Sequence, residues 1–183
     1  MGGGKDNTLP SVRKAFYEYI ESISVPAPLR FQYNSWYDYM KDITEQNIMT
    51  SFTEVHKQLS HYGAPELAAY VVDDGWPDVK AGFWSFNKKF PNKLTNVTAL
   101  CKEMGSKFGL WLGPRGGYTR PDKIAKRYQR AGNGYLNKEA RDICVASTKY
   151  IEKLGDFLVE TTNEFDIDYW KLDGFCLKPC LNE

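Results

Sequence analysis

The chain has 183 residues, a formal net charge of +1, 42% hydrophobic residues and 15% aromatic residues. This length suits one domain with a real core, and the high aromatic content excludes disorder over most of the chain. The near-zero charge gives no argument for a nucleic-acid partner, and no apolar run reaches the roughly 20 residues of a membrane-spanning helix. We therefore expect a folded protein with neither a nucleic-acid nor a membrane partner.

The first 25 residues are predicted to stand apart from the rest of the chain. Residues 1–5 read Met-Gly-Gly-Gly-Lys and lack the apolar core of a secretory signal, so they are typical of a tag remnant and leave the localisation unknown. Residues 12–23 have apolar positions at helical spacing, which predicts a helix before the first strand. The expected domains are therefore residues 1–25, a tag and leading helix, and residues 26–183, the main domain.

The remaining chain alternates short β-like runs with helical stretches. The predicted strands lie within residues 29–36, 67–73, 108–113 and 167–173, and the predicted helices within residues 44–62, 96–104 and 147–164. Gly63 and Gly105 directly follow two of these helices, as C-terminal glycines often do, and Asn96 and Ser147 are candidate N-caps. Six glycines and prolines between residues 114 and 138 predict a long loop.

Strands that alternate with helices imply a parallel sheet with right-handed crossovers. The polar residues gather at the C-terminal ends of the strands, which is where an α/β barrel carries its active site. A full barrel takes about 250 residues, and only four strand–helix units are visible here. The predicted fold is therefore α/β, with about the first four βα units of a parallel TIM barrel. A small doubly wound sheet of four strands is the alternative.

The four cysteines give no strong metal signature. Cys176 and Cys180 form a C-x3-C pair, whereas Cys101 and Cys144 are isolated and both histidines lie far away in the sequence. A zinc site needs further ligands at matching spacing, so we expect no metal. Free thiols are the favoured interpretation, and a disulfide is the alternative.

The last predicted strand carries a cation and a carboxylate on one face. Lys171 and Asp173 are two positions apart, so their side chains leave a strand on the same side, and Leu172 points the other way. A neighbouring cation lowers the pKa of a carboxyl group and keeps it ionised. An ionised carboxylate in a cleft at a strand end is suited to attack a sugar carbon. A structural ion pair is the alternative.

Two adjacent carboxylates end the apolar run of residues 67–72. Asp73 and Asp74 repel each other and need an external partner, for which the hydroxyl groups of a sugar are suited as hydrogen-bond donors. Trp76 follows them and offers an aromatic face to a pyranose ring. A helix N-cap with a solvated neighbouring Asp is the alternative.

Trp36 and Trp111 also lie at or near the ends of predicted strands. A tryptophan at any one such position is usually a core residue. Several of them at one rim are less easily explained by packing alone, and they favour a binding pocket.

Taken in order, these segments resemble the α-galactosidase-type glycoside hydrolases of families 27 and 36, and family 36 most closely. The matching segments are Asn34-Ser35-Trp36, Asp73-Asp74-Gly75-Trp76 with residues 89–92, and residues 107–111 and 167–173, so that the resemblance covers about residues 29–178. The resemblance implies a (β/α)8 catalytic barrel and retaining hydrolysis of α-linked galactose or N-acetylgalactosamine. It implies no metal and no cofactor.

The resemblance also gives each candidate residue a role toward the sugar. Asp173 corresponds to the catalytic nucleophile, and the expected sugar-binding residues are Lys171, Asp73, Asp74, Trp36, Trp111 and Trp76. The acid/base carboxylate of the family sits on a later strand. We therefore expect the chain to be the N-terminal part of a catalytic domain and to be inactive alone.

Two other functions remain open at this stage. One is a non-catalytic carbohydrate-binding or degenerate barrel protein, which would keep the binding residues without turnover. The other is a half-barrel unit that covers its exposed strand edges by pairing with a second copy or with the remaining half of a barrel. The sequence does not decide between galactose and N-acetylgalactosamine.

Overall fold

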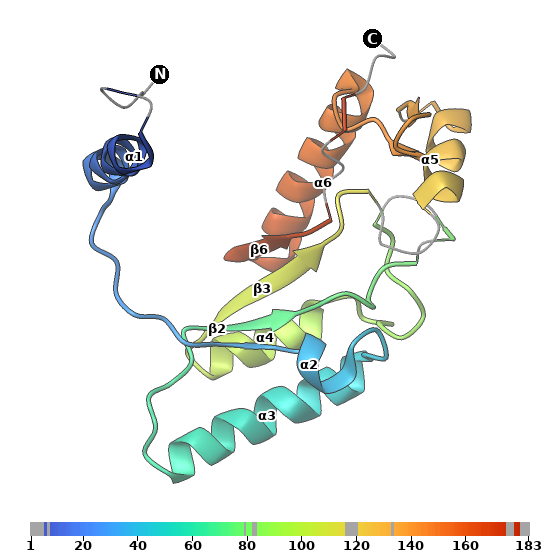
Figure 1. The fold of residues 1–183 in the computed structure, drawn as a ribbon. Coiled ribbons are helices and arrows are strands. Elements are labelled where there is room, and N and C mark those ends of the chain that lie inside the picture. Colours follow the sequence, from blue (N-terminus) through green and yellow to red (C-terminus); the bar gives the residue numbers. More distant parts are fainter. Residues whose placement is uncertain are drawn as a thin grey trace. The chain divides into compact units, whose positions relative to one another are not determined.

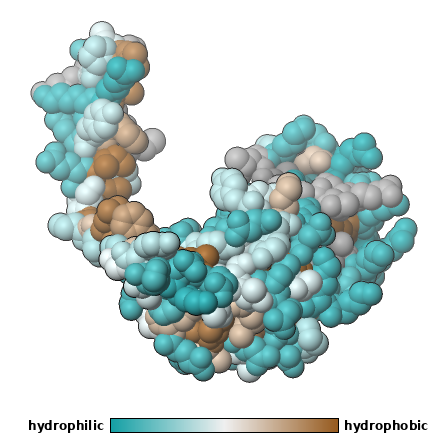
Figure 2. Space-filling view, turned by 90° about the horizontal axis from the view of Figure 1, so that it is seen from below, coloured by the Kyte–Doolittle hydropathy of each residue, from teal (hydrophilic) through white to brown (hydrophobic). Residues whose placement is uncertain are grey.

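The computed structural model describes residues 6, 8–78, 80–81, 84–115, 121–132, 134–174 and 178–179. The chain divides into two compact units, residues 1–30 and residues 31–183. In the first unit, α1 (Leu9–Ile23) contains the predicted leading helix and begins at Thr8, whose hydroxyl accepts a hydrogen bond from the Ser11 amide. No residue of α1 is buried, and Figure 2 shows apolar side chains along the surface of this unit.

The second unit is built on a four-stranded parallel sheet with the strand order β1-β2-β3-β6. The strands are β1 (Gln32–Asn34), β2 (Ala69–Val72), β3 (Lys107–Leu112) and β6 (Tyr169–Leu172). All four residues of β2 are buried, as expected for a central strand covered on both faces. The predicted parallel α/β sheet is confirmed, and within the described residues β1 and β6 are its edges (Figure 1).

Five helices and a short antiparallel pair of strands complete this unit as the structure describes it. The helices are α2 (Trp36–Tyr39), α3 (Glu45–His61), α4 (Thr95–Glu103), α5 (Pro121–Arg130) and α6 (Thr148–Phe165). The antiparallel pair is β4 (Leu136–Asn137) with β5 (Asp142–Ile143), and α5 packs against both. Figure 1 shows α3 and α4 next to each other along the sheet.

The core lies between the sheet and these helices. Phe52 of α3 packs on Tyr70 of β2 with ring centroids 4.8 Å apart, and Val97 of α4 and Leu110 of β3 are also fully buried. Burying each such side chain stabilises the folded state by about 1.5–3 kcal/mol. None of the described helices is both long and apolar enough to span a membrane.

The predicted loop over residues 114–138 is wrong in part, because α5 occupies residues 121–130. Proline is well tolerated in the first turn of a helix, where its missing N–H has no partner to lose, and Pro121 is the first residue of α5. Ile124, Ala125 and Tyr128 give the helix a buried face. The glycines and prolines therefore mark the ends of a helix. Residues 116–120 and 133 lie outside the described residues.

The predicted helix ends are partly confirmed. Gly63 and Gly105 follow α3 and α4 with φ angles of +65° and +69°, as C-terminal glycines do. The predicted capping role of Asn96 is wrong, because α4 begins after Leu94 and the side-chain Nδ2 of Asn96 donates to the Glu45 carboxylate instead. Ser147 is the N-cap residue of α6, although its hydroxyl makes no capping bond.

The cysteines differ from the expectation of free thiols. Cys144 is disulfide-bonded, whereas Cys101 is a buried free thiol whose pKa burial raises to about 12. Cys176 and Cys180 lie outside the described residues. In the part of the chain that the structure describes, no group of three or more His, Cys, Asp or Glu side chains could hold a metal ion.

Candidate functional site

The carboxyl ends of the parallel strands border a pocket of about 370 Å³. Its lining consists of two indoles, two lysines and three carboxylates: Trp36, Trp111, Lys41, Lys171, Asp73, Asp74 and Asp173. Six of these seven residues are those that the sequence pattern selected. Parallel strands place their C-terminal ends at one edge of the sheet, which is why residues far apart in the sequence meet here.

Backbone contacts between neighbouring strand ends hold the carboxylates in place. The amide of Asp73 donates to the hydroxyl of the buried Ser35, 3.0 Å away, and the amide of Ser35 donates to the carbonyl of Val71. On the other side, the Asp173 amide donates to the carbonyl of Leu112 at 3.1 Å. Asp73 and Asp173 are therefore fixed by the sheet although both lie just beyond their strands.

Lys171 forms an ion pair with Asp73. Its Nζ lies 2.7 Å from Asp73 Oδ2, and the Asp73 side chain is only 2% exposed. The sequence pattern predicts that Lys171 acts on Asp173, two positions further along the chain, whereas its ammonium contacts Asp73. Because β3 lies between β2 and β6, the long side chain of Lys171 reaches across one strand to the buried carboxylate.

Asp74 has its own cation, and this cation was not among the sequence candidates. Lys41 Nζ lies 3.3 Å from Asp74 Oδ2, and the Asp74 side chain is 8% exposed. Burial raises the pKa of Asp74, whereas the charge of Lys41 opposes that rise. Lys41 belongs to no strand-end pattern, so only the folded chain reveals it. The sequence gives one signal for such a residue: two adjacent carboxylates repel each other, and a nearby cation relieves that repulsion.

Asp173 is oriented by an indole. Trp111 Nε1 donates a long hydrogen bond of 3.4 Å to Asp173 Oδ2. This N–H donor fixes the direction of the Asp173 carboxylate. Trp36, on the β1 side of the pocket, is held at its backbone, because its amide donates to the side-chain oxygen of Asn34 at 2.9 Å.

Trp76 does not line this pocket, which corrects its predicted place at the pocket wall. It is fully buried, and its Nε1 donates to the carbonyl of Trp111 at 2.8 Å. Its ring stacks on Phe157 with centroids 6.2 Å apart. The packing interpretation therefore fits Trp76, which supports the backbone of a pocket residue from the core.

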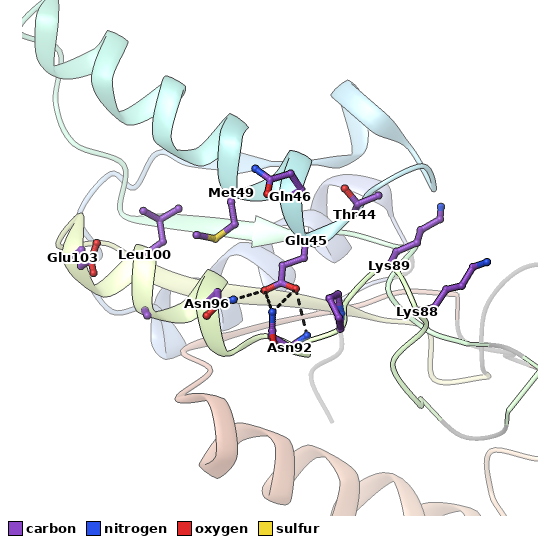
Figure 3. Close-up of a pocket in the computed structure, with 12 residues that line it drawn as sticks. Thr44, Glu45, Gln46, Met49, Lys88, Lys89, Asn92, Asn96, Leu100 and Glu103 are labelled. Carbon is purple, nitrogen blue, oxygen red and sulfur yellow. Dashed lines mark hydrogen bonds between the residues drawn. The ribbon is translucent and has the colours of Figure 1, made fainter.

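A larger hollow of about 710 Å³ lies between α3 and α4, away from the strand ends (Figure 3). Its only buried charge, among the residues described there, is Glu45. The Glu45 carboxylate accepts hydrogen bonds from the backbone and side chain of Asn92 and from Asn96. These contacts tie the start of α3 to the start of α4, so the Glu45 carboxylate has a structural role.

Comparison with known proteins bears on what the smaller pocket does. No family model matches the chain. It is 27% identical over 156 residues to α-galactosidase 1 from Pediococcus pentosaceus, and the match covers 76% of this chain and 20% of that protein. The chain resembles α-galactosidases. The resemblance noted in the sequence is confirmed by this relative.

Solved structures agree with the chain in fold. The α-galactosidase TtGalA from Thermus thermophilus in complex with stachyose matches with a TM-score of 0.62 and 20% identity, over 87% of this chain and 36% of that one. The family 36 α-galactosidase AgaA from Geobacillus stearothermophilus matches with a TM-score of 0.62 and 20% identity, over 91% and 24%. The chain spans about a fifth of the curated relative and about a quarter to a third of these two structures.

Proposed function

We propose that this chain forms the sugar-binding and nucleophilic part of a retaining glycoside hydrolase that acts on α-linked galactose or N-acetylgalactosamine. The observation that carries the proposal is the convergence of three carboxylates, two lysines and two indoles in one pocket at the strand ends. The names of the relatives support the substrate class. In this proposal the four βα units form part of a (β/α)8 barrel.

The charged pairs of the pocket would bind the sugar. Asp73 and Asp74 would accept hydrogen bonds from its distal hydroxyl groups, and Lys171 would donate to a hydroxyl oxygen beside Asp73. Hydrogen bonds to ionised groups are about twice as strong as neutral ones, so such contacts would fix the orientation of the ring. Trp36 and Trp111 would present apolar surface to the ring carbons.

Asp173 would act as the nucleophile. Its carboxylate would attack the anomeric carbon while a carboxylic acid protonates the leaving oxygen, and a water molecule would then hydrolyse the glycosyl ester. The hydrogen bond from Trp111 would keep the attacking Asp173 carboxylate oriented toward the anomeric carbon. A retaining enzyme needs a second carboxyl group about 5–5.5 Å from the first.

Asp73 and Asp74 are poor candidates for this second carboxyl group. The oxygens of each carboxylate already face a lysine ammonium, Lys171 Nζ at 2.7 Å from Asp73 and Lys41 Nζ at 3.3 Å from Asp74, so neither carboxyl group is placed to hand a proton to a leaving oxygen. We therefore assign the acid/base role to a carboxyl group outside the described lining of this pocket. General acid–base catalysis typically contributes 10²–10⁴-fold, so the chain alone would bind sugar with little turnover.

Calorimetric titration with galactose and with N-acetylgalactosamine, combined with an assay of an aryl α-galactoside, tests the proposal. We expect the 183-residue chain to bind galactose, the Asp73→Asn variant to bind at least about tenfold more weakly, and neither to turn over the aryl galactoside. The Asp156→Asn variant changes an exposed residue of α6 and should bind like the parent chain. If the chain bound neither galactose nor N-acetylgalactosamine, the substrate class would be wrong. Robust turnover of the aryl galactoside would contradict the assignment of the acid/base role to a carboxyl group outside the described lining of the pocket.

A further inference from the structure

Lys41 lies in the pocket without belonging to any of the segments that carry the resemblance. It follows α2 in the loop that leads to α3, and its side chain is 44% exposed at the pocket. Its partner, the Asp74 carboxylate, is almost completely buried. The ion pair therefore consists of a partly solvent-exposed ammonium group and a buried carboxylate.

The charges around Asp74 make this cation important. Burial and the neighbouring Asp73 both disfavour ionisation of Asp74, whereas Lys41 and the amide of Gly75 favour it. The second lysine of the pocket, Lys171, lies 2.7 Å from Asp73. Lys41 is therefore the cation that offsets the burial of Asp74.

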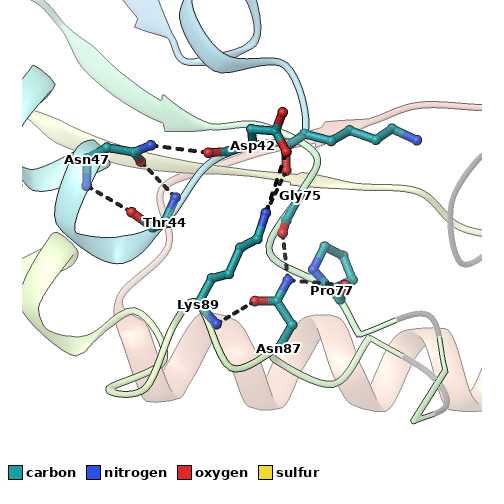
Figure 4. A network of polar contacts seen from close by, with 8 residues as sticks. Asp42, Thr44, Asn47, Gly75, Pro77, Asn87 and Lys89 are labelled. Carbon is teal, nitrogen blue, oxygen red and sulfur yellow. Dashed lines mark hydrogen bonds and ion pairs between the residues drawn. The ribbon is translucent and has the colours of Figure 1, made fainter.

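The backbone of Lys41 is fixed by close packing against Gly75. A Cβ at Gly75, where φ is +129°, would lie 2.7 Å from both the Lys41 carbonyl oxygen and Ile43 Cγ1. Lys89 Nζ donates to the same Lys41 carbonyl at 3.4 Å, and the side-chain Nδ2 of Asn87 donates to the Gly75 carbonyl at 2.6 Å. Figure 4 shows this network around Gly75, Asn87 and Lys89.

The chain turns sharply just before Lys41. Met40 has φ +48° and ψ −122°, a backbone conformation that costs an L-residue of order 1–3 kcal/mol. Thr44 and Asn47 exchange capping hydrogen bonds at the start of α3 and so fix the other end of the loop. The turn at Met40 and the cap formed by Thr44 and Asn47 thus fix both ends of the loop that carries Lys41, and they keep Lys41 next to Asp74.

We propose that Lys41 is a positioning residue that keeps the Asp74 carboxylate charged and available in the pocket as an acceptor for the hydroxyl groups of a bound sugar. The identity of the ligand as a galactose-type sugar rests on the proposed function. The pairing itself does not, because it follows from the ion pair, the burial of Asp74 and the fixed backbone of Lys41.

The experiment measures galactose binding between pH 5 and 8 and the titration of the Asp74 carboxyl group by NMR in four forms of the 183-residue chain. These forms are the parent chain, Lys41→Met, Lys41→Arg and the control Lys57→Met, which removes an exposed lysine on α3. We expect Lys41→Met to titrate Asp74 at higher pH and to bind galactose about tenfold more weakly at pH 6. The loss should shrink as the pH rises, since deprotonation restores the acceptor. Lys41→Arg should behave like the parent chain.

Two results would overturn the role of Lys41. One is an unchanged Asp74 titration in Lys41→Met, and the other is a binding loss of equal size at every pH, which a purely structural effect would give. If the parent chain binds neither galactose nor N-acetylgalactosamine, the proposed function fails, and the Asp74 titration still decides the pairing. A shift in Lys41→Met then supports the ion pair, and no shift overturns it.

Discussion

At the scale of single residues, the pocket is organised by two lysine–carboxylate pairs that the sequence alone did not reveal. Their spacing in the sequence predicts that Lys171 and Asp173 act on each other, yet the Lys171 ammonium contacts Asp73, just beyond the end of β2. Adjacency along one strand is visible in a sequence. A pairing across strands depends on side-chain length and register, which only the folded chain supplies.

The burial of Asp74 predicts a distinctive dependence of stability on pH. Because the pKa of Asp74 is raised in the folded chain, the folded state binds more protons than the unfolded state between the ordinary carboxyl value and the raised one. In that window Asp74 lowers the free energy of unfolding as the pH rises. Asp74→Asn should remove this decline and leave the chain at least as stable as the parent at pH 7.

Urea denaturation of the parent chain and Asp74→Asn from pH 4 to pH 8 checks this prediction. The Asp38→Asn variant, in which an exposed carboxylate that bonds Tyr33 is changed, serves as the comparison for a surface site. A loss of stability in Asp74→Asn at pH 7 of more than about 1 kcal/mol would mean that the Lys41 pair outweighs the burial of the charge.

At the scale of secondary structure, the sequence predicted elements well where the periodicity was strong. The apolar run before Asp73 is a buried central strand, and α3 and α6 lie within two residues of their predicted ranges. The helix α5 was missed because glycine and proline at its ends suggested a loop, although its buried face follows helical spacing. The Asn96 side chain bonds the Glu45 carboxylate of another helix instead of capping α4, and no local sequence pattern encodes such a contact.

Two glycines give opposite predictions for the same substitution. Gly75→Ala would place a Cβ 2.7 Å from the Lys41 carbonyl at a positive φ, so we expect a loss of more than about 2 kcal/mol in the free energy of unfolding. Gly155→Ala lies within α6 with nothing within 4 Å of the new Cβ, and should stabilise the chain by about 0.5–1 kcal/mol. Thermal or urea denaturation of both variants checks the pair. Equal changes in the free energy of unfolding for the two variants would contradict the close approach of Gly75 to the Lys41 backbone.

At the scale of the whole molecule, the sheet leaves two strands with one neighbour each among the described residues. β2 and β3 are almost fully buried, whereas the edge strand β6 has Tyr169 41% exposed and Leu172 42% exposed. An open edge with apolar side chains tends to pair with another chain. We therefore expect the isolated chain to dimerise or aggregate, and light scattering measures this. A stable monomer at tens of micromolar would favour a self-contained doubly wound sheet over part of a barrel.

The most direct test of the central claim asks whether Asp173 forms a covalent bond to galactose. α-Galactosyl fluoride needs little protonation of its leaving group, so Asp173 can displace fluoride slowly even if, as proposed, no acid/base carboxyl group lines the described pocket. The glycosyl ester should then accumulate, because no such group would activate water to hydrolyse it. Incubation of the 183-residue chain followed by peptide mass spectrometry should give one galactosyl adduct on Asp173, and Asp173→Asn should give none. An adduct on Asp73 or Asp74, or no adduct in a chain that binds galactose, would contradict the assignment of Asp173 as the nucleophile.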